Sequence, residues 1–212
     1  MRRSRWVLSV ERPGTCGLTH NLVGTDAREQ NIGTAVWHAQ GESAIRASGI
    51  PFTFVQPSEF RSNAPFWARS IKAEGVVRSV TGDGKIPFIH SQDIAEVTTA
   101  ALTSRAYDGQ SLPITGPEAL SYAEMTAKIS AVIGKRIRYQ AISDDEERQR
   151  MLERGEAADI VAAHLSIYGA IREGRLATVT DTVERVLGRR PMTFDQWLKE
   201  NATAFRNSAD AS

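Results

Sequence analysis

His38 is the residue whose type and position first indicate chemistry. An imidazole titrates near neutral pH and can act as a general acid or base. It lies in "VWHAQGESAIRASGIPFTFVQPSEF" (residues 36–60), which predicts a helix, a glycine stop, an apolar strand and a proline loop. The short "SGI" connection requires helix and strand to run antiparallel, and a helix of roughly 21 Å then brings His38 level with the end of the strand. Ligands of α/β sheets bind at that end. The alternative is a histidine that faces solvent or a polar pocket.

Composition excludes several classes of function. The 212 residues contain 26 Lys and Arg against 25 Asp and Glu, so no basic excess predicts nucleic-acid binding. The single cysteine, Cys16, cannot form an internal disulfide and is read as a free thiol. His20, His90 and His164 share no metal-ligand spacing, so no metal site is expected. The apolar runs are too short to span a membrane, and "ERPG" follows "MRRSRWVLSV" too soon for a signal peptide, which predicts a cytoplasmic protein.

Glycine and proline residues mark the boundaries of the secondary-structure elements in the first half of the chain. "RWVLSV" (5–10) predicts a strand and "ERPGTCG" (11–17) a loop. Residues 34–48 predict a helix that Gly49 ends, and residues 51–56 a buried strand. The helix is expected to pack on one side, where it carries Ala35, Ala39, Ala44 and Ile45, and to expose Glu42 and Arg46.

Further along, Asn63 and Pro65 predict a helix start, and Gly75 its end. "GDG" (82–84) predicts a turn, Ser91 a helix cap and "SLPIT" (111–115) a strand. "SYAE", "SDDE" and "TFDQ" (121–124, 143–146 and 193–196) have capping-box spacing. "RIRYQAI" (136–142) predicts one more strand.

Strand–helix alternation up to about residue 115 predicts an α/β fold with a mostly parallel sheet. We therefore expect two domains: residues 1–116 as a partial Rossmann-like domain, and residues 117–212 as a smaller, mainly helical lobe.

Four segments resemble the NmrA-like family of atypical short-chain dehydrogenase/reductase proteins. "HAQGESAIRASGIPFTFVQPSEFRSN" is similar to its helix, strand and "RP-x-x-F-x-x-N" loop, and "IPFIHSQDIAEVTTAAL" to its "D-I-A" helix start. "GQSLPITGPEALSYAEMTAKISAVIGKRIRYQAIS" and "YGAIREGRLATVTDTVERVLGRRPMTFDQWLKENATAF" resemble its C-terminal half. The resemblance implies a Rossmann-type domain that binds NADP(H) or NAD(H), a substrate lobe, and oxidation or reduction of a small organic molecule.

The family's first strand leads into a glycine-rich loop that holds the cofactor pyrophosphate. No G-x-x-G-x-x-G occurs in this chain, which resembles a truncated member entered near its fifth strand, about ninety residues late. Weak or absent dinucleotide binding is therefore expected. Residues 5–10 would form an exposed sheet edge, which predicts a homodimer or poor solubility.

The resemblance also assigns candidate site residues. His38 falls where classical relatives carry a lysine that contacts the nicotinamide ribose, although Thr34, not tyrosine, lies four residues earlier. Ser9 matches a hydroxyl beside the substrate, so His38 and Ser9 are the catalytic candidates. Gln56, Pro57 and Ser58 match the loop beside the cofactor, with Gln56 replacing the usual arginine. Substrate-binding candidates are Phe60, Asn63 and Trp67, and Tyr168 is a further candidate for the pocket between the lobes.

Structural roles compete with several of these assignments. Phe60 and Trp67 can serve as core packing, Asn63 as a helix cap and Asp93 of "D-I-A" as a favourable charge at a helix start. Two functions from different classes remain open: an NAD(P)-dependent oxidoreductase, or a cofactor-free small-molecule binding protein, isomerase, cyclase or regulatory sensor.

Overall fold

The computed structural model describes residues 16–19, 32–59 and 67–206. The mixed α/β architecture predicted from the sequence is confirmed. A three-stranded parallel sheet has the order β1-β2-β5, formed by β1 (Cys16–Thr19), β2 (Phe52–Pro57) and β5 (Ser111–Ile114). Cys16 is opposite Phe52, and Phe54 is opposite Ser111. The expected strand at 51–56 is therefore confirmed, and it occupies the centre of the sheet.

One part of the sheet differs from expectation. The prediction of a loop over residues 11–17 is wrong at its end, because Cys16 and Gly17 begin β1. Pairing with the distant β2 supplies backbone hydrogen bonds that the glycine-rich local sequence does not reveal. The expected strand at 5–10, with Ser9, lies outside the described residues, so its pairing and the expected association of chains stay predictions.

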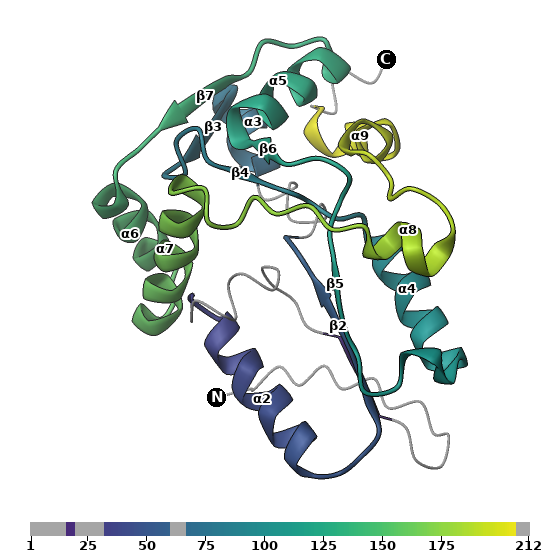
Figure 1. Cartoon of the computed structure of the whole chain (residues 1–212). Helices are drawn as coiled ribbons and strands as arrows, with labels where there is room; N and C mark the ends of the chain where they lie inside the picture. Colours follow the sequence, from purple (N-terminus) through teal and green to yellow (C-terminus); the bar gives the residue numbers. More distant parts are fainter. Residues whose placement is uncertain (1–15, 20–31, 60–66, 207–212) are drawn as a thin grey trace.

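Helices α2 (Ala35–Ala47) and α4 (Ser91–Thr103) cover opposite faces of this sheet (Figure 1). The alternation of side chains along β2 explains the arrangement. Phe54 faces α2, where the Arg46 guanidinium lies 4.9 Å from its ring centroid. Val55 faces the other way and packs in a buried cluster with Val97 and Ala101 of α4.

The packed face of α2 differs from the prediction. Glu42 was expected outside but is buried, with 6% of its surface exposed, whereas Ala44 is exposed. The physical reason lies on β2, where the Gln56 amide Nε2 donates to both carboxylate oxygens of Glu42 at 3.0 Å. A buried carboxylate needs hydrogen-bond donors. The residue pattern of the helix cannot show this donor, because it lies on a different element.

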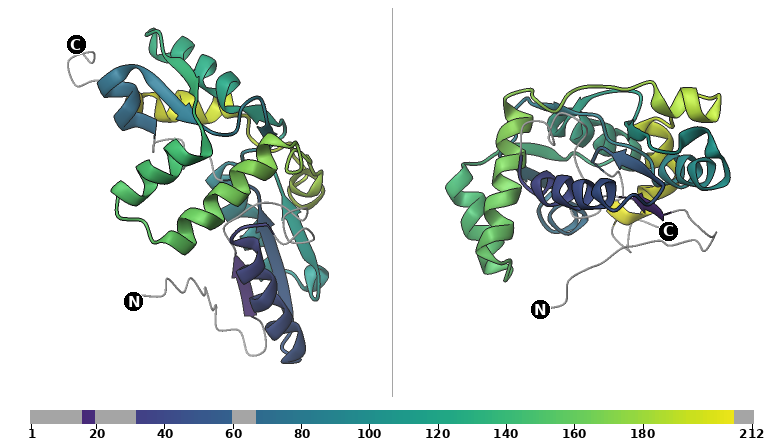
Figure 2. Two further views of the ribbon diagram at one scale, coloured as in Figure 1. Left: turned by 90° about the vertical axis from the view of Figure 1, so that its left-hand side faces the viewer. Right: turned by 60° about the horizontal axis from the view of Figure 1, so that its bottom comes forward.

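The remaining elements form a second part of the molecule, stacked on the first (Figure 2). Its strands pair as β3 (Val76–Ser79) with β7 (Arg138–Ala141), parallel, and β4 (Lys85–Ile86) with β6 (Leu120–Ser121), antiparallel. The predicted turn at "GDG" is present, but the strands beside it pair elsewhere. Both sheets join segments from before and after residue 117, and the division into two domains stays a prediction.

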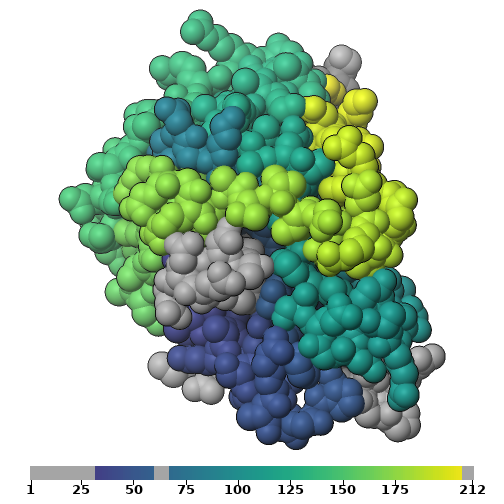
Figure 3. All heavy atoms as spheres, in the orientation of Figure 1, coloured from purple at the N-terminus to yellow at the C-terminus, as the bar shows by residue number. Residues whose placement is uncertain are grey.

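Further helices and short 3₁₀ turns complete the fold, some against these short sheets and others against α4 and β5 of the three-stranded sheet. They are α3 (Ala68–Glu74), α5 (Tyr122–Ile133), α6 (Asp144–Glu153), α7 (Ala158–Arg172), α8 (Thr182–Leu187), α9 (Phe194–Asn201), η2 (Arg105–Tyr107) and η3 (Ala202–Phe205). In the space-filling view, the segment from α7 to α8 crosses the middle of one face (Figure 3). None of the helices in the described part of the chain combines the length and apolar character needed to cross a membrane.

Helix ends follow the predicted caps with one exception. Ser121 with Glu124 and Thr193 with Gln196 form complete capping boxes, and the Ser143 hydroxyl accepts from the Glu146 amide. Helix α3 ends at Gly75 as expected. The prediction that Ser91 caps α4 is wrong by one residue: His90 is the N-cap, and its Nδ1 accepts from the Gln92 amide at 3.0 Å. His90 has the extended backbone that an N-cap requires.

Two glycines allow the chain to approach the backbone of α7. A Cβ at Gly33 would lie 2.6 Å from the Ala163 carbonyl oxygen, and one at Gly84 would overlap the Ile171 carbonyl. Gly33 also has φ of +52°, a left-handed conformation that side chains disfavour. The start of α2 and the turn before β4 thus contact α7 at two points that are about two helical turns apart. Only glycine permits such a close approach at either point.

A buried carboxylate connects α4 to the C-terminal segment. Asp93 is fully buried and accepts from Arg189 Nη1 at 2.7 Å and from the Met192 amide at 2.9 Å. Arg189 Nη2 also donates to Glu96 at 2.6 Å, and this bond is the main cause that raises the pKa of Arg189 and lowers that of Glu96. The Asp93–Arg189 clamp therefore holds the chain between α8 and α9 against the sheet.

We expect Gly33→Ala to lower the free energy of unfolding by about 2–4 kcal/mol, because the new methyl group adds a positive-φ penalty to a clash with α7. The matched control is Gly41→Ala in the middle of α2, where a Cβ meets nothing within 4 Å. That change should stabilise by about 0.5–1 kcal/mol. Urea unfolding measures both. Equal effects at the two positions would contradict the close approach.

We expect Asp93→Asn to destabilise the fold by about 2–3 kcal/mol, since it breaks an ion pair that is enclosed on the Asp93 side and exposed on the Arg189 side. Glu96→Gln, at the exposed end of the same network, should shift the thermal midpoint far less. Differential scanning calorimetry compares the two variants. A larger loss with Glu96→Gln would mean that the clamp is not what holds this segment.

Candidate functional site

A cavity of about 1110 Å³ opens between α3, β3, α6 and α7. One wall is aromatic and consists of Trp67, Phe88, Tyr122 and Tyr168. A charged rim carries Glu147, Arg150, Glu153, Arg154, Glu156 and His164. Glu59, the second residue after β2, also lines the cavity. A concave site that combines an apolar wall with polar groups suits a small-molecule ligand.

The aromatic wall is built around Tyr122, the first residue of α5. Its ring lies 4.9 Å from that of Trp67 and 6.0 Å from that of Phe88. Burial is the largest cause that raises the pKa of the Tyr122 and Tyr168 hydroxyls, and nearby negative charge, including that of Glu59, adds to it. Both phenols therefore keep their protons at neutral pH and can donate hydrogen bonds to a ligand.

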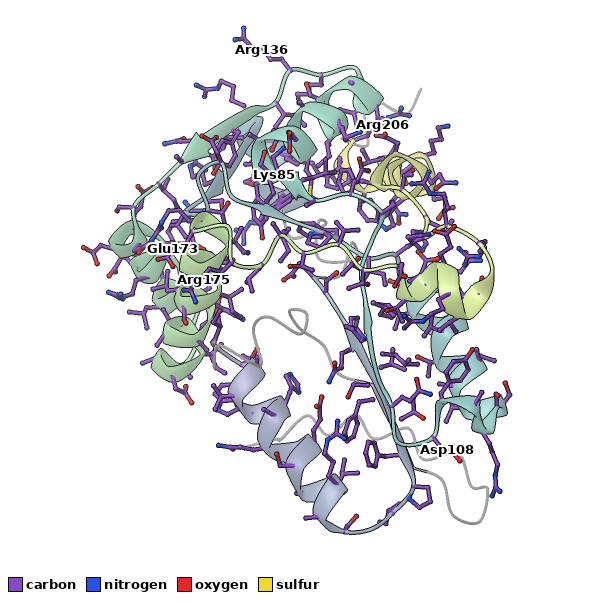
Figure 4. The ribbon with its side chains drawn as sticks, in the orientation of Figure 1. Lys85, Asp108, Arg136, Glu173, Arg175 and Arg206 are labelled. Carbon is purple, nitrogen blue, oxygen red and sulfur yellow. The ribbon has the colours of Figure 1, made fainter. Side chains whose placement is uncertain are left out.

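The charged rim is already paired within the protein. Glu147 lies 3.3 Å from Arg150 and 3.4 Å from Arg154. Arg154 also donates to Glu156 at 3.0 Å, and although burial opposes its charge, the bonds to the two carboxylates leave its pKa raised. The charges of the rim thus largely cancel. Further out, the residues labelled in Figure 4 belong to the molecular surface, where Glu173 and Arg175 form an ion pair of 2.8 Å after α7.

The carboxyl end of β2 carries the three residues expected to bind cofactor. Gln56 and Ser58 are buried, with 4% and 2% exposed, and their side chains are used inside the protein. Gln56 donates to Glu42, and the Ser58 hydroxyl donates to the Pro87 carbonyl. Pro57 ends the strand opposite Ile114. A cofactor contact by these residues, which stays a prediction, would therefore use their surface and not free side-chain donors.

His38 lies where the sequence predicted it, near the carboxyl edge of the sheet. Gln56, the fifth residue of β2, faces Glu42, and His38 is one turn of α2 nearer to the helix N-terminus. His38 is half-buried. Four residues earlier, the Thr34 hydroxyl is buried without a hydrogen-bond partner. A buried hydroxyl without a hydrogen-bond partner costs free energy, and a hydrogen bond to a bound polar ligand would remove that cost.

The structure brings only some of the predicted site residues together. Trp67 and Tyr168 line the cavity, whereas Thr34 and His38 lie on α2, whose N-terminus abuts α7 at Gly33. Phe60 and Asn63, like Ser9, lie outside the described residues. Sequence reasoning assigned no role to Tyr122, Glu156 or His164, although His164 and Tyr168 have the i, i+4 spacing of one helix face. Within the described ranges, no three metal-ligating side chains are grouped.

No protein-family model matches this chain. It is 34% identical over 194 residues to an NAD(P)H azoreductase of Xenophilus azovorans, an alignment that covers 90% of this chain and 68% of the relative. The chain belongs to the same family. These proteins are NmrA-like members of the atypical short-chain dehydrogenase/reductase superfamily, as the quoted motifs predicted.

A second relative is the (4-alkanoyl-5-oxo-2,5-dihydrofuran-3-yl)methyl phosphate reductase of Streptomyces griseus, 36% identical over 166 residues. This alignment covers 78% of the NmrA-like chain but 58% of the relative, so the chain spans little more than half of that protein.

Solved structures share the fold. The NADPH-dependent quinone oxidoreductase of Escherichia coli aligns with a TM-score of 0.77 and 20% identity, over 88% of this chain and 67% of that protein. The triphenylmethane reductase of Citrobacter sp. aligns with a TM-score of 0.73, also at 20% identity, over 88% and 65%. At this identity the likeness establishes a shared Rossmann-like fold and nothing about activity.

Proposed function

We propose that this NmrA-like chain is the substrate-binding and catalytic part of an NAD(P)-dependent reductase of small aromatic acceptors, such as quinones or azo compounds. The observation that carries the proposal is the aromatic-walled cavity at the end of β2. Membership in a family that includes an NAD(P)H azoreductase supports the reaction class.

The cavity suits a flat aromatic acceptor. Its volume of about 1110 Å³ accommodates a molecule of several fused or linked rings. The tilted rings of Trp67 and Tyr122 provide faces against which such a molecule can stack. The protonated hydroxyls of Tyr122 and Tyr168 can donate to a carbonyl oxygen or an azo nitrogen, the atoms that gain electron density on reduction.

A bound NADPH or NADH supplies a hydride. Among the described residues, Thr34 and His38 fit the nicotinamide half of this cofactor. The Thr34 hydroxyl has no hydrogen-bond partner, and both residues lie near the carboxyl edge of the sheet. A ribose hydroxyl or carboxamide there would satisfy Thr34. Gln56 and Ser58 contribute packed surface beneath this position. The pyrophosphate half has no counterpart among the described residues.

The alternative function, a cofactor-free binding protein, isomerase, cyclase or sensor, is favoured by one observation: the 212 residues contain no G-x-x-G-x-x-G. Without that cradle of backbone amides, dinucleotide affinity rests on side chains alone. Both functions use the same cavity, and they differ in whether NAD(P)H is consumed.

Turnover tests the proposal directly. The purified chain is mixed with NADPH or NADH and 1,4-naphthoquinone, and absorbance at the nicotinamide band is followed. We expect quinone-dependent oxidation, and we expect Trp67→Ala to raise KM about tenfold by removing a stacking face. The control is Trp37→Ala on α2, whose side chain is exposed. Quinone binding without loss of NAD(P)H would favour the cofactor-free alternative, and no binding would reject the cavity as the site.

His38→Ala should abolish turnover and ligand response while leaving the thermal midpoint nearly unchanged, because a half-buried imidazole at the edge of the sheet contributes little to the core. Gln40→Ala, an exposed substitution on the same helix, serves as the matched control. Thermal melts and steady-state assays are run in parallel. A His38 variant that unfolds, or that keeps full activity, would assign this histidine a purely structural role.

A further inference from the structure

His164 and Tyr168 project from one face of α7 into the cavity. Their ring centroids lie 6.4 Å apart, as expected for positions i and i+4 of a helix. Among the described residues that line the cavity, His164 is the only imidazole. The family resemblance and the cofactor proposal give it no role, yet an imidazole can both donate and accept a proton.

The His164 imidazole lies beside Glu156. Its Nδ1 is buried and lies 3.6 Å from Glu156 Oε2, while 36% of the side chain is exposed. The exposed part of the ring is therefore the edge away from Glu156. A separation of 3.6 Å is longer than a hydrogen bond, but catalytic contacts are often long in free proteins and shorten when a ligand binds.

Glu156 itself is fixed by a cation. Its other oxygen, Oε1, accepts from Arg154 Nε at 3.1 Å and from Nη2 at 3.0 Å. This side-on pair orients the carboxylate and leaves Oε2 for the imidazole. A carboxylate placed at Nδ1 favours the tautomer with a proton on that nitrogen, and it stabilises the imidazolium that carries a second proton on Nε2.

We propose that His164 is the proton donor of the reduction, with Glu156 as its positioning residue. This inference rests on the proposed function. A hydride from a bound NAD(P)H would carry two electrons and one hydrogen nucleus to the acceptor, form one new bond there and leave an anion on the reduced acceptor. That anion takes a proton from Nε2 of the His164 imidazolium. The N–H bond breaks, neutral imidazole remains, and water returns the proton after product leaves.

Tyr168 has a different task. Its raised pKa, caused first by burial and then by the charge of Glu59, makes it a poor acid that retains its proton. It can hold the acceptor by a hydrogen bond while His164 supplies the proton. The other charged or titratable groups that line the cavity come from α3, β3, α5, α6, α7 and the segments after β2 and α6. They are Glu59, Arg69, Glu74, Arg78, Tyr122, Glu147, Arg150, Glu153, Arg154, Glu156 and Tyr168.

The pH dependence has a defined sign. A general acid acts in its protonated form, so kcat of the unaltered chain should fall towards high pH. His164→Gln cannot donate a proton, so this descending limb of the pH profile should disappear. Glu156→Gln removes the carboxylate beside Nδ1, so kcat should fall while KM changes little.

The experiment measures kcat and KM with NADPH and 1,4-naphthoquinone across pH for the full chain and its variants. We expect His164→Gln to lower kcat at least about 100-fold with KM changed less than about threefold. Matched controls outside the cavity are Ser166→Ala on α7 and Asp159→Asn in its first turn, both exposed. Thermal melts verify that each variant folds. If His164→Gln does not fold, Glu156→Gln provides the second test.

The outcomes separate this inference from the function on which it rests. An unaltered chain that never oxidises NADPH overturns both. An active chain whose His164→Gln variant keeps kcat within about twofold, or keeps the descending limb, overturns the proton-donor role alone. A loss of kcat that is equal at all pH values, with the limb preserved, would likewise reject it. Loss of the limb in His164→Gln, together with a lower kcat and an almost unchanged KM in Glu156→Gln, supports it.

Discussion

The position of α7 depends on direct approach of other backbone segments to its own. Gly33 meets the helix at Ala163 and Gly84 meets it at Ile171, and in both places a methyl group would collide with a carbonyl oxygen. Contacts of this kind are short-range and stiff, so the helix has little freedom to slide. Because α7 carries His164 and Tyr168, the shape of the cavity follows from these two glycine contacts.

Most buried polar groups of the described residues have hydrogen-bond partners inside the protein. Gln56 donates to Glu42, and Arg189 donates to Asp93 of α4. The arginines of the cavity rim pair with glutamates in the same way. Exceptions in the described part of the chain include the Thr34 hydroxyl and His164 Nδ1, which lies 3.6 Å from Glu156. Unsatisfied polar groups in a compact fold mark positions where a ligand can lower the free energy.

Local signals in the sequence predicted much of the fold. The helix at 34–48, the strand at 51–56, the glycine stops and two capping boxes depend on neighbours within four residues, so sequence pattern is sufficient. Other features were not predictable from local pattern. The burial of Glu42 and the pairing of β3 with β7 depend on groups far away in the chain. The cap by His90 instead of Ser91 depends on backbone angles, which composition does not encode. The candidate site divides in the same way. The site role of His38 stays a prediction, whereas the cavity and its His164–Glu156 pair arise from α3, α6 and α7 meeting in space.

The Asp93–Arg189 clamp has a consequence for the order in which the chain acquires structure. The two residues are separated by 96 positions, so during synthesis α4 leaves the ribosome long before its partner exists. Until Arg189 and the Met192 amide emerge, the Asp93 carboxylate must stay hydrated, and α4 cannot seal against the sheet without burying a lone charge. A buried acid near the middle of the sequence thus makes the packing of α4 depend on a segment close to the C-terminal end of the described chain.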